Sequence, residues 1–313
     1  MNGRFRFGLS LALIIGAAAL PAGAATQLTL ATGGTAGTYY PLGGAMAQIW
    51  NAKVGGVNVS VQATGASAEN IRLINKKQVD LAFVQNDINH YAYKGIEVFK
   101  EKLPDFAVIA ALYPEIVQIV VAADSPIKSV ADLKGKRVSV GAPGSGVEAN
   151  ARQILESFKM NYTSIKPLFL SFAESADQFK NGQIDAFFVV AGAPTAAIQD
   201  VAAQHKIRLL SFTDAQIEKL ADEYQFFSKV VIPARTYSGQ AEAVTTVAVK
   251  ATLICRPDLE EGLVYNLTKT LFENLGAMGH AKAKEITLKD AVVGISTPYH
   301  PGALRYFREM KVK

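Results

Sequence analysis

Apolar residues along the chain follow two alternating patterns. Short apolar or alternating runs at 27–31, 58–62 and 80–85 predict strands, and each is followed by a segment with helical spacing. After a longer apolar run at 108–121, the same alternation continues from 137 to 190. Alternating strands and helices are typical of parallel sheets with helices on both faces. The sequence therefore predicts an α/β fold.

Two helix–turn–strand units repeat one sequence pattern. The unit at 68–84 matches the unit at 173–189, and an aspartate opens the strand in each, Asp80 or Asp185. Such units arise by duplication, or by convergence on a common α/β building block. Both interpretations imply two similar half-structures, and therefore two lobes.

The lobe boundaries follow from two long extended runs. The segments at 105–122 and 244–254 are apolar and rich in β-branched residues, as expected where the chain crosses between lobes. About 290 residues after the leader exceed the usual size of one hydrophobic core. We predict a signal peptide at 1–24, a first lobe that starts with 25–112, a second lobe at 113–248, and a return to the first lobe at 249–313.

The N-terminus has the order of a secretory signal peptide. Arg4 and Arg6 are basic, 9–20 is apolar, and Ala22-Gly23-Ala24 is a small-residue cleavage site. The apolar run is shorter than the roughly 18 residues that a membrane-spanning helix needs. We expect cleavage after Ala24 or Ala25 and a soluble protein in the periplasm.

Composition limits the remaining classes. Cys255 is the single cysteine, so an intramolecular disulfide is impossible, and we expect this residue to lie buried in a strand. Without the leader's two arginines, 30 basic residues face 27 acidic ones, a net charge of +3. Such a weak bias argues against a nucleic-acid partner. We expect a monomer.

Three loops rich in glycine, serine and threonine follow predicted strands and open predicted helices. They lie at 32–41, 64–67 and 141–146, and we expect Ser67 to be a helix N-cap. Helix N-termini present free N–H groups and a positive dipole end, which suits an anion. In open α/β sheets, ligands bind beyond the carboxyl ends of strands. The three loops therefore predict one cleft that binds an anion.

Enzyme signatures are incomplete or missing in the sequence. The loop at 141–146 lacks the lysine of a phosphate-binding P-loop, and Glu148 would repel a phosphate. A loose dinucleotide pattern there lacks its acidic ribose-binding partner. The sequence contains no Gly-x-Ser-x-Gly elbow and no His-Glu-x-x-His pair, and its four histidines are dispersed. We predict no catalytic residue, no cofactor and no metal site.

Polar residues at strand ends complete the candidate site. Gln85-Asn86-Asp87 follow one predicted strand, and Tyr113-Pro114-Glu115 and Gln118 lie in the crossing segment. Ala191-Gly192-Ala193-Pro194-Thr195 follow the matching strand of the second lobe. For Asp87, helix capping is an equally good interpretation. The predicted ligand-binding residues are Thr35, Gly37, Tyr39, Thr64, Ser67, Asn70, Gln85, Asp87, Gln118, Ser145, Gly146, Ala193 and Pro194.

The sequence resembles one family along nearly its whole length after the leader. The segments that carry the resemblance are LATGGTAGTYYPLG at 30–43, TGASAENIRLI at 64–74, VDLAFVQND at 79–87, ALYPEIVQIVV at 111–121, DLKGKRVSVGAPGSG at 132–146 and IDAFFVVAGAP at 184–194. They resemble the TAXI family of solute-binding proteins, which serve tripartite ATP-independent periplasmic (TRAP) transporters.

This resemblance implies a fold and a function. Family members resemble class II periplasmic binding proteins, with two α/β lobes joined by a two-strand hinge, and typically bind small carboxylates such as glutamate or 2-oxoglutarate. It implies a receptor that captures a small anionic carboxylate and delivers it to a TRAP membrane permease. Val147 departs from the Ser-Gly-Thr-Glu pattern often found in the second-lobe loop, so a hydroxyl is missing there. The alternatives are a periplasmic sensor or chemoreceptor partner and an exported enzyme.

Overall fold

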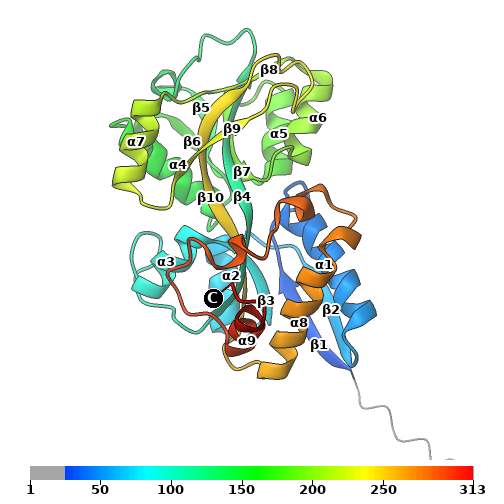
Figure 1. Ribbon diagram of the computed structural model, residues 1–313. Coiled ribbons are helices and arrows are strands. Elements are labelled where there is room, and N and C mark those ends of the chain that lie inside the picture. The colour runs from blue at the N-terminus through cyan, green and yellow to red at the C-terminus, as the bar shows by residue number, and fades with distance from the viewer. Residues whose placement is uncertain (1–24, 313) are drawn as a thin grey trace, which may run out of the picture.

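The computed structural model describes residues 25–312, so the predicted signal peptide lies outside the described residues. These residues form two lobes that share a single mixed sheet with strand order β2-β1-β3-β10-β4-β7-β5-β6, while β8 pairs with β4 and β9 with β10 (Figure 1). The α/β prediction is confirmed. None of the described helices is long and apolar enough to cross a membrane.

Lobe I contains the first three strands and both ends of the described chain (Figure 1). β1 pairs in parallel with β2 and with β3, as the strand–helix alternation predicted. Its elements are β1 (Thr26–Ala31), α1 (Tyr39–Lys53), β2 (Val57–Gln62), α2 (Ser67–Asn75), β3 (Leu81–Gln85), α3 (Asn86–Lys94), α8 (Glu261–Glu273) and α9 (Pro301–Glu309).

Lobe II repeats the plan, with β5 parallel to both β6 and β7. Apolar clusters fill it, one of them containing residues of α4 and α7 and another residues of α5 and α6. Its elements are β5 (Arg137–Ser139), α4 (Gly146–Ser157), β6 (Lys166–Leu168), α5 (Phe172–Lys180), β7 (Ala186–Ala191), α6 (Ala196–Gln204), β8 (Ile207–Leu209), α7 (Asp214–Glu223) and β9 (Ser228–Ile232).

Two long strands connect the lobes. β4 (Ala107–Ala122) and β10 (Val244–Cys255) run antiparallel and pass through both lobes (Figure 1). The first half of β4 pairs with β10, and its second half pairs with β7 and β8. The β4–β10 register shifts between Lys250 and Thr252, next to the crossing. These two strands hold the lobes together and bring their loops to face each other.

The lobe I core explains why the long apolar runs are buried. β1, β3, β4 and β10 carry fully buried side chains that pack with α1, α8 and α9 into one cluster. Trp50 of α1 is fully buried, and its indole N–H donates to the carbonyl of Leu267 in α8 at 2.9 Å. This contact joins the N-terminal part of lobe I to the segment that returns from lobe II. Cys255 is buried at the end of β10, which confirms the prediction for this residue.

Candidate functional site

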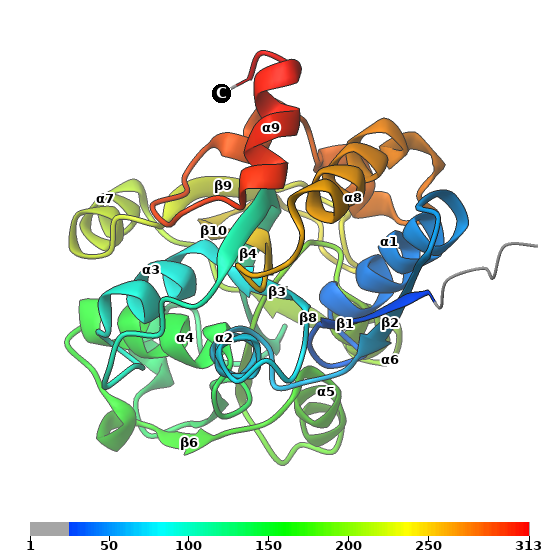
Figure 2. The ribbon, with the colours of Figure 1, turned by 90° about the horizontal axis from the view of Figure 1, so that it is seen from below.

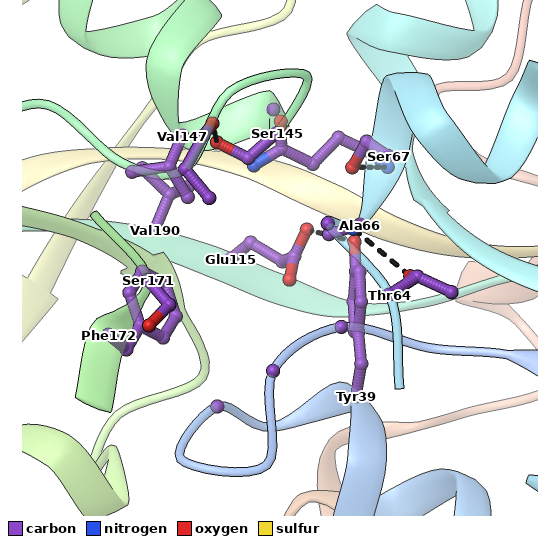
Figure 3. Close-up of a pocket in the computed structure, with 17 residues that line it drawn as sticks. Tyr39, Thr64, Ala66, Ser67, Glu115, Ser145, Val147, Ser171, Phe172 and Val190 are labelled. Carbon is purple, nitrogen blue, oxygen red and sulfur yellow. Dashed lines mark hydrogen bonds between the residues drawn. The ribbon is translucent and has the colours of Figure 1, made fainter. Parts of the chain in front are cut away.

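A pocket of about 150 Å³ lies between the lobes (Figure 3). Lobe I contributes the loops after β1 and β2 and the end of β3, lobe II contributes the loops before α4 and α5, and β4 crosses between them. The lining residues are Gly33, Gly34, Gly37, Tyr39, Thr64, Gly65, Ala66, Ser67, Gln85, Glu115, Ala142, Ser145, Gly146, Val147, Ser171, Phe172 and Val190.

Glu115 is the acidic side chain of this pocket and lies where β4 crosses between the lobes. Its neighbour Ile116 pairs with Ala248 of β10 and also with Ala191 of β7. The carboxyl group is 2% exposed and accepts a 2.7 Å hydrogen bond from the hydroxyl of Tyr39 (Figure 3). The ring of Tyr39 stacks on Phe83 at 4.9 Å, which fixes the direction of this donor.

The electrostatic state of Glu115 follows from its surroundings. Burial raises the pKa of Glu115 to about 8; repulsion by Asp87 also raises it, whereas hydrogen bonds from Tyr39 and Gln85 lower it. No lysine, arginine or histidine is among the described residues that line the pocket. The carboxyl group is therefore held in the cleft without a cationic partner.

The glycine-rich loop after β1 lets the lobes approach closely. A Cβ atom placed on Gly37 would lie 3.3 Å from the ring of Phe172, which belongs to α5 of lobe II. Phe172 forms an apolar wall with Val147 and Val190 on the lobe II side (Figure 3). The glycine at position 37 thus allows an aromatic side chain to close this end of the pocket.

Thr64 and Asn70 form a structural connection beneath the pocket. The Thr64 hydroxyl lies 3.0 Å from the carbonyl of Thr32 and 2.6 Å from Oδ1 of Asn70, and it accepts a bond from the N–H of Ala66. The Asn70 amide donates to the carbonyls of Thr32 and Phe83 at 2.6 and 2.8 Å. Asn70 is fully buried and joins the loop after β1 to strand β3.

The start of α2 corrects one prediction. Ser67 is the first helical residue, and the N-cap is Ala66, which has a φ of 72° and makes no side-chain cap bond. The Ser67 hydroxyl instead accepts the N–H of Gln85 at 3.2 Å. The N–H groups of Ala68 and Glu69 donate to the carbonyl of Gly144 in lobe II. This helix start therefore binds the other lobe.

The start of α4 does face the pocket. Ser145 is its N-cap, and its hydroxyl accepts the N–H of Glu148 at 3.1 Å and donates to the carbonyl of Ala142 at 2.7 Å. Gly146 and Val147 follow, and both line the pocket. The N–H groups of a helix's first residues have no partner within the helix, so they are free to bind an anion here.

Gln85 reaches across the pocket from lobe I to α4. A Cβ atom on Gly146 would overlap Oε1 of Gln85, so only glycine leaves room for this side chain. Gln85 is 2% exposed, and its Oε1 has no hydrogen-bond partner among the described residues. A buried acceptor without a donor costs free energy, so a ligand with a donor group would be stabilised here.

The structure divides the predicted ligand-binding residues into two groups. Those that line the pocket are Gly37, Tyr39, Thr64, Ser67, Gln85, Ser145 and Gly146. The others lie elsewhere: Thr35 and Pro194 are exposed, Ala193 is half-buried, and Asn70 is buried beneath the loops. Gln118 is buried in lobe II, where it bonds to Thr195 and Tyr237. Asp87 contacts Asn150 across the lobes.

Sequence reasoning named Glu115 among the polar residues of the crossing segment but did not include it among the predicted ligand-binding residues. An acidic residue in the apolar run of β4 was the available signal, because glutamate is rarely buried without a partner. The pocket residues Ala142, Val147, Ser171, Phe172 and Val190 were missed as well. Apolar side chains carry no sequence signal that separates a pocket wall from an ordinary core.

Direct contacts between the lobes show that they are closed over the pocket. The Asn150 amide donates to Asp87 at 2.8 Å, and the Gln153 amide donates to the Tyr91 hydroxyl at 3.0 Å. On the other side of the cleft, the hydroxyl of Thr38 accepts the N–H of Gly192 at 3.1 Å. An enclosed site of this kind suits a small molecule held by both lobes.

The sequence matches one known protein family along most of its length. A family model described as the NMT1-like family matches residues 30–310. The chain belongs to the NMT1-like family. Among curated proteins, a putative aliphatic sulfonates-binding protein of Escherichia coli (strain K12) is 36% identical over 76 residues. That match spans 24% of this chain and 24% of the relative, about a quarter of each.

Solved structures resemble this NMT1-like protein in fold. The alkanesulfonate-binding protein of Xanthomonas axonopodis pv. citri, bound to MOPS, is 18% identical, with a TM-score of 0.54 over 93% of this chain and 85% of that one. PhnD1 of Prochlorococcus marinus, in complex with methylphosphonate, is 12% identical, with a TM-score of 0.54 over 92% and 99% of the two chains. The two-lobe fold of periplasmic solute-binding proteins is thereby confirmed.

Proposed function

We propose that this NMT1-like protein is an exported receptor that encloses a small carboxylate between its lobes and delivers it to the membrane permease of a TRAP transporter. The main support is that residues of both lobes line the pocket, while β4 and β10 connect the lobes. Opening at these strands would admit a ligand, and closing would bury it and change the outer surface.

The chemistry of the pocket supports a small anion. The start of α4 presents N–H groups at Gly146 and Val147. The hydroxyls of Ser145, Ser171 and Tyr39 also line the pocket, and each donates its proton to an acceptor of the protein. Preorganised N–H groups at a helix start can hold a carboxylate without an arginine. Two relatives of the same fold were solved with small anions, methylphosphonate and the sulfonate buffer MOPS. The volume of about 150 Å³ suits a molecule of this size.

An enzyme is disfavoured by what the described residues offer. No group of three or more possible metal ligands occurs among them. The Cys255 thiol is buried in lobe I, away from the pocket, and burial raises its pKa, so it is a poor nucleophile. Within residues 25–312, no histidine lines the pocket, so no serine–histidine pair is formed there.

The choice of permease has two candidates. The resemblance to the TAXI family, carried by the loops that line this pocket, favours a TRAP permease. A solved structure described as a putative L-cystine ABC transporter of Listeria monocytogenes favours an ABC permease, with 16% identity and a TM-score of 0.51 over 87% of this chain and 98% of that one. A sensor or chemoreceptor partner would use the same closed form. Solute uptake by membrane vesicles without ATP separates these candidates, because a TRAP system needs only an ion gradient.

Ligand binding is the test of the receptor itself. Ligand-stripped protein would be screened by thermal shift with L-glutamate, 2-oxoglutarate, succinate, methanesulfonate, methylphosphonate and glucose. We expect a carboxylate to raise the melting temperature in proportion to the logarithm of its concentration, with one molecule bound per chain. Stabilisation by the sulfonate, the phosphonate or glucose alone would contradict the proposed ligand class.

A further inference from the structure

Two acceptor groups without a cation lie side by side in the pocket. Glu115 and Gln85 both line it, and each is 2% exposed. Oε1 of Gln85 has no donor among the residues that the structure describes. Both acceptors lie inside the cleft, where an unpaired acceptor or a lone carboxylate costs free energy.

The groups that face Glu115 give it no positive partner. Tyr39 of α1 donates one hydrogen bond, and Tyr113 of β4 and Asp87 of α3 act on the electrostatics of this cluster without adding a cation. On the lobe II side, α4, α5 and β7 present Val147, Phe172 and Val190, which are apolar. Lys282, whose side chain lies against Gly192, is paired with Glu285. A ligand ammonium group would supply the positive partner that these residues do not provide.

We propose that Glu115 and Gln85 form a subsite for a ligand ammonium group, so that the receptor selects α-amino acids over the corresponding 2-oxoacids. The ammonium group would donate to the Glu115 carboxylate and to Oε1 of Gln85. The ligand carboxylate would lie at the start of α4, next to Gly146. This inference rests on the proposed function and narrows its ligand class.

The arrangement of charges supports a zwitterion. The N-terminus of α4 is the positive end of a helix dipole, Oε1 of Gln85 lies against Gly146 there, and Glu115 lies on β4. A ligand with a negative and a positive group separated by one carbon would satisfy the helix start and the two side chains. A 2-oxoacid would place a carbonyl oxygen against the unpaired acceptor of Gln85, and a site left with unpaired polar groups discriminates strongly.

The test compares pairs of ligands that differ only at one carbon. Calorimetry at pH 7 would measure binding of L-glutamate against 2-oxoglutarate, L-alanine against pyruvate, and L-leucine against 4-methyl-2-oxopentanoate. For the pair that binds, we expect the amino acid to bind at least tenfold more tightly than its 2-oxoacid. Repeating the titration in two buffers of different ionisation enthalpy counts protons. We expect net proton release on amino-acid binding, because Glu115 is neutral in the ligand-free closed protein and ionised in the complex.

Variants separate the subsite from general damage. Glu115→Gln keeps the shape and removes the charge, so we expect roughly 100-fold weaker binding of the amino acid and a much smaller change for the 2-oxoacid. Gln85→Met should lower the same selectivity by a smaller factor. Glu69→Gln is the matched control, because its carboxylate accepts the N–H of Gly65 and is not part of the pocket lining. It should leave the selectivity ratio unchanged.

The outcomes are distinguishable. A 2-oxoacid that binds as tightly as its amino acid, amino-acid binding without net proton release, or equal losses for both ligands in Glu115→Gln would overturn the ammonium subsite alone. If Glu115→Gln does not fold, the pair comparison on the native protein and on Gln85→Met decides the question. If no carboxylate of either kind binds, the proposed function fails together with this inference.

Discussion

At the scale of single residues, the Tyr39–Glu115 pair determines the chemistry of the cleft. Tyr39 was predicted to line a ligand site, and it does line the pocket, where its hydroxyl bonds to Glu115. Desolvation of a carboxyl group favours its neutral form, while each hydrogen bond that it accepts favours the charged form. A small change in the surroundings of Glu115, such as an arriving cation, therefore shifts its protonation.

The pH dependence of stability tests this state of Glu115. Its pKa is raised from 4.5 to about 8 in the closed protein, so the neutral form is favoured by folding. The contribution to stability is complete below about pH 4.5 and is lost as the pH rises through 8. We expect the ligand-free native protein to lose stability relative to Glu115→Gln by on the order of a few kcal/mol between pH 5 and pH 9. Urea unfolding of both proteins across this range measures the difference.

Asp87 provides the control for that experiment. Burial raises the pKa of Asp87 to about 6, so its own contribution is lost at lower pH than that of Glu115. The difference between the native protein and Asp87→Asn should therefore change mainly between pH 4 and pH 7. Parallel stability curves for the native protein and Glu115→Gln above pH 6 would show that Glu115 is not held neutral.

Residue roles were only partly predictable from sequence. Gly37, Ser145 and Gly146 were recognised because glycine and small hydroxyl residues after a strand indicate a helix start near a ligand. Glu115 was named in the crossing segment but left out of the predicted site, because neither its burial nor its partner Tyr39, which is distant in the chain, follows from local sequence. Asn70 was assigned to the ligand because a buried asparagine that holds loops together has the same local pattern as a binding residue.

At the scale of elements, strand–helix alternation predicted the parallel parts of the sheet well. The helical segment expected after the first strand is α1 (Tyr39–Lys53), and the apolar run at 108–121 is β4 (Ala107–Ala122). The antiparallel pairing of β4 with β10 is set by contacts between distant segments. The start of α2 was predicted to bind the anion, but the N–H groups of its first turn donate to the carbonyl of Gly144 in lobe II. This contact also joins segments that are distant in the chain.

The close approach of Gln85 to α4 predicts a steric block at Gly146. A Cβ atom there would overlap Oε1 of Gln85, and the φ of Gly146 is not positive, so Gly146→Ala should fold. We expect it to keep the lobes apart and to weaken ligand binding by at least tenfold. Small-angle scattering with and without ligand measures the closure, together with calorimetry.

Gly44→Ala is the matched control for this substitution. Gly44 lies in α1, and a Cβ atom there meets nothing within 4 Å. This variant should close and bind like the native protein. Normal compaction and affinity in Gly146→Ala would show that the Gln85–α4 contact is not needed for closure.

At the scale of the whole molecule, closure depends on a few buried polar contacts. Asn150 and Asp87 are both at most 1% exposed, and their bond is the most deeply buried side-chain link between the lobes that we describe. The Arg152–Glu97 ion pair nearby has side chains 26% and 27% exposed. Partly exposed ion pairs contribute little, whereas an unpaired buried carboxylate is costly.

Removing Asn150 should therefore open the molecule. In Asn150→Ala, Asp87 loses its donor and is solvated only if the lobes separate, so we expect a larger radius of gyration and at least tenfold weaker binding above pH 7. Scattering and calorimetry measure both quantities. Arg152→Ala should change affinity by less than about threefold. Equal effects of the two variants would contradict this assignment of the interlobe contacts.

The two-lobe architecture was predictable because alternation and length both indicate two half-structures. The contacts between the lobes were not, since they depend on the angle of closure at β4 and β10 and involve residues such as Asp87, Asn150, Tyr91 and Gln153 that lie far apart in the chain. Asp87 was predicted either to contact the ligand or to cap a helix, and in the structure its carboxylate accepts a hydrogen bond from Asn150 of the opposite lobe. A polar residue directly after a strand, such as Asp87, fits a ligand contact and a contact between the lobes equally well.

The most direct measurement is a crystal structure of the protein with the tightest ligand of the panel. The account predicts one molecule in the pocket between the lobes, its carboxylate within hydrogen-bond distance of the N–H groups of Gly146 or Val147, and its ammonium group against Glu115 and Gln85. A ligand bound outside this pocket, or a ligand carboxylate placed against Glu115 with the start of α4 unused, would contradict it.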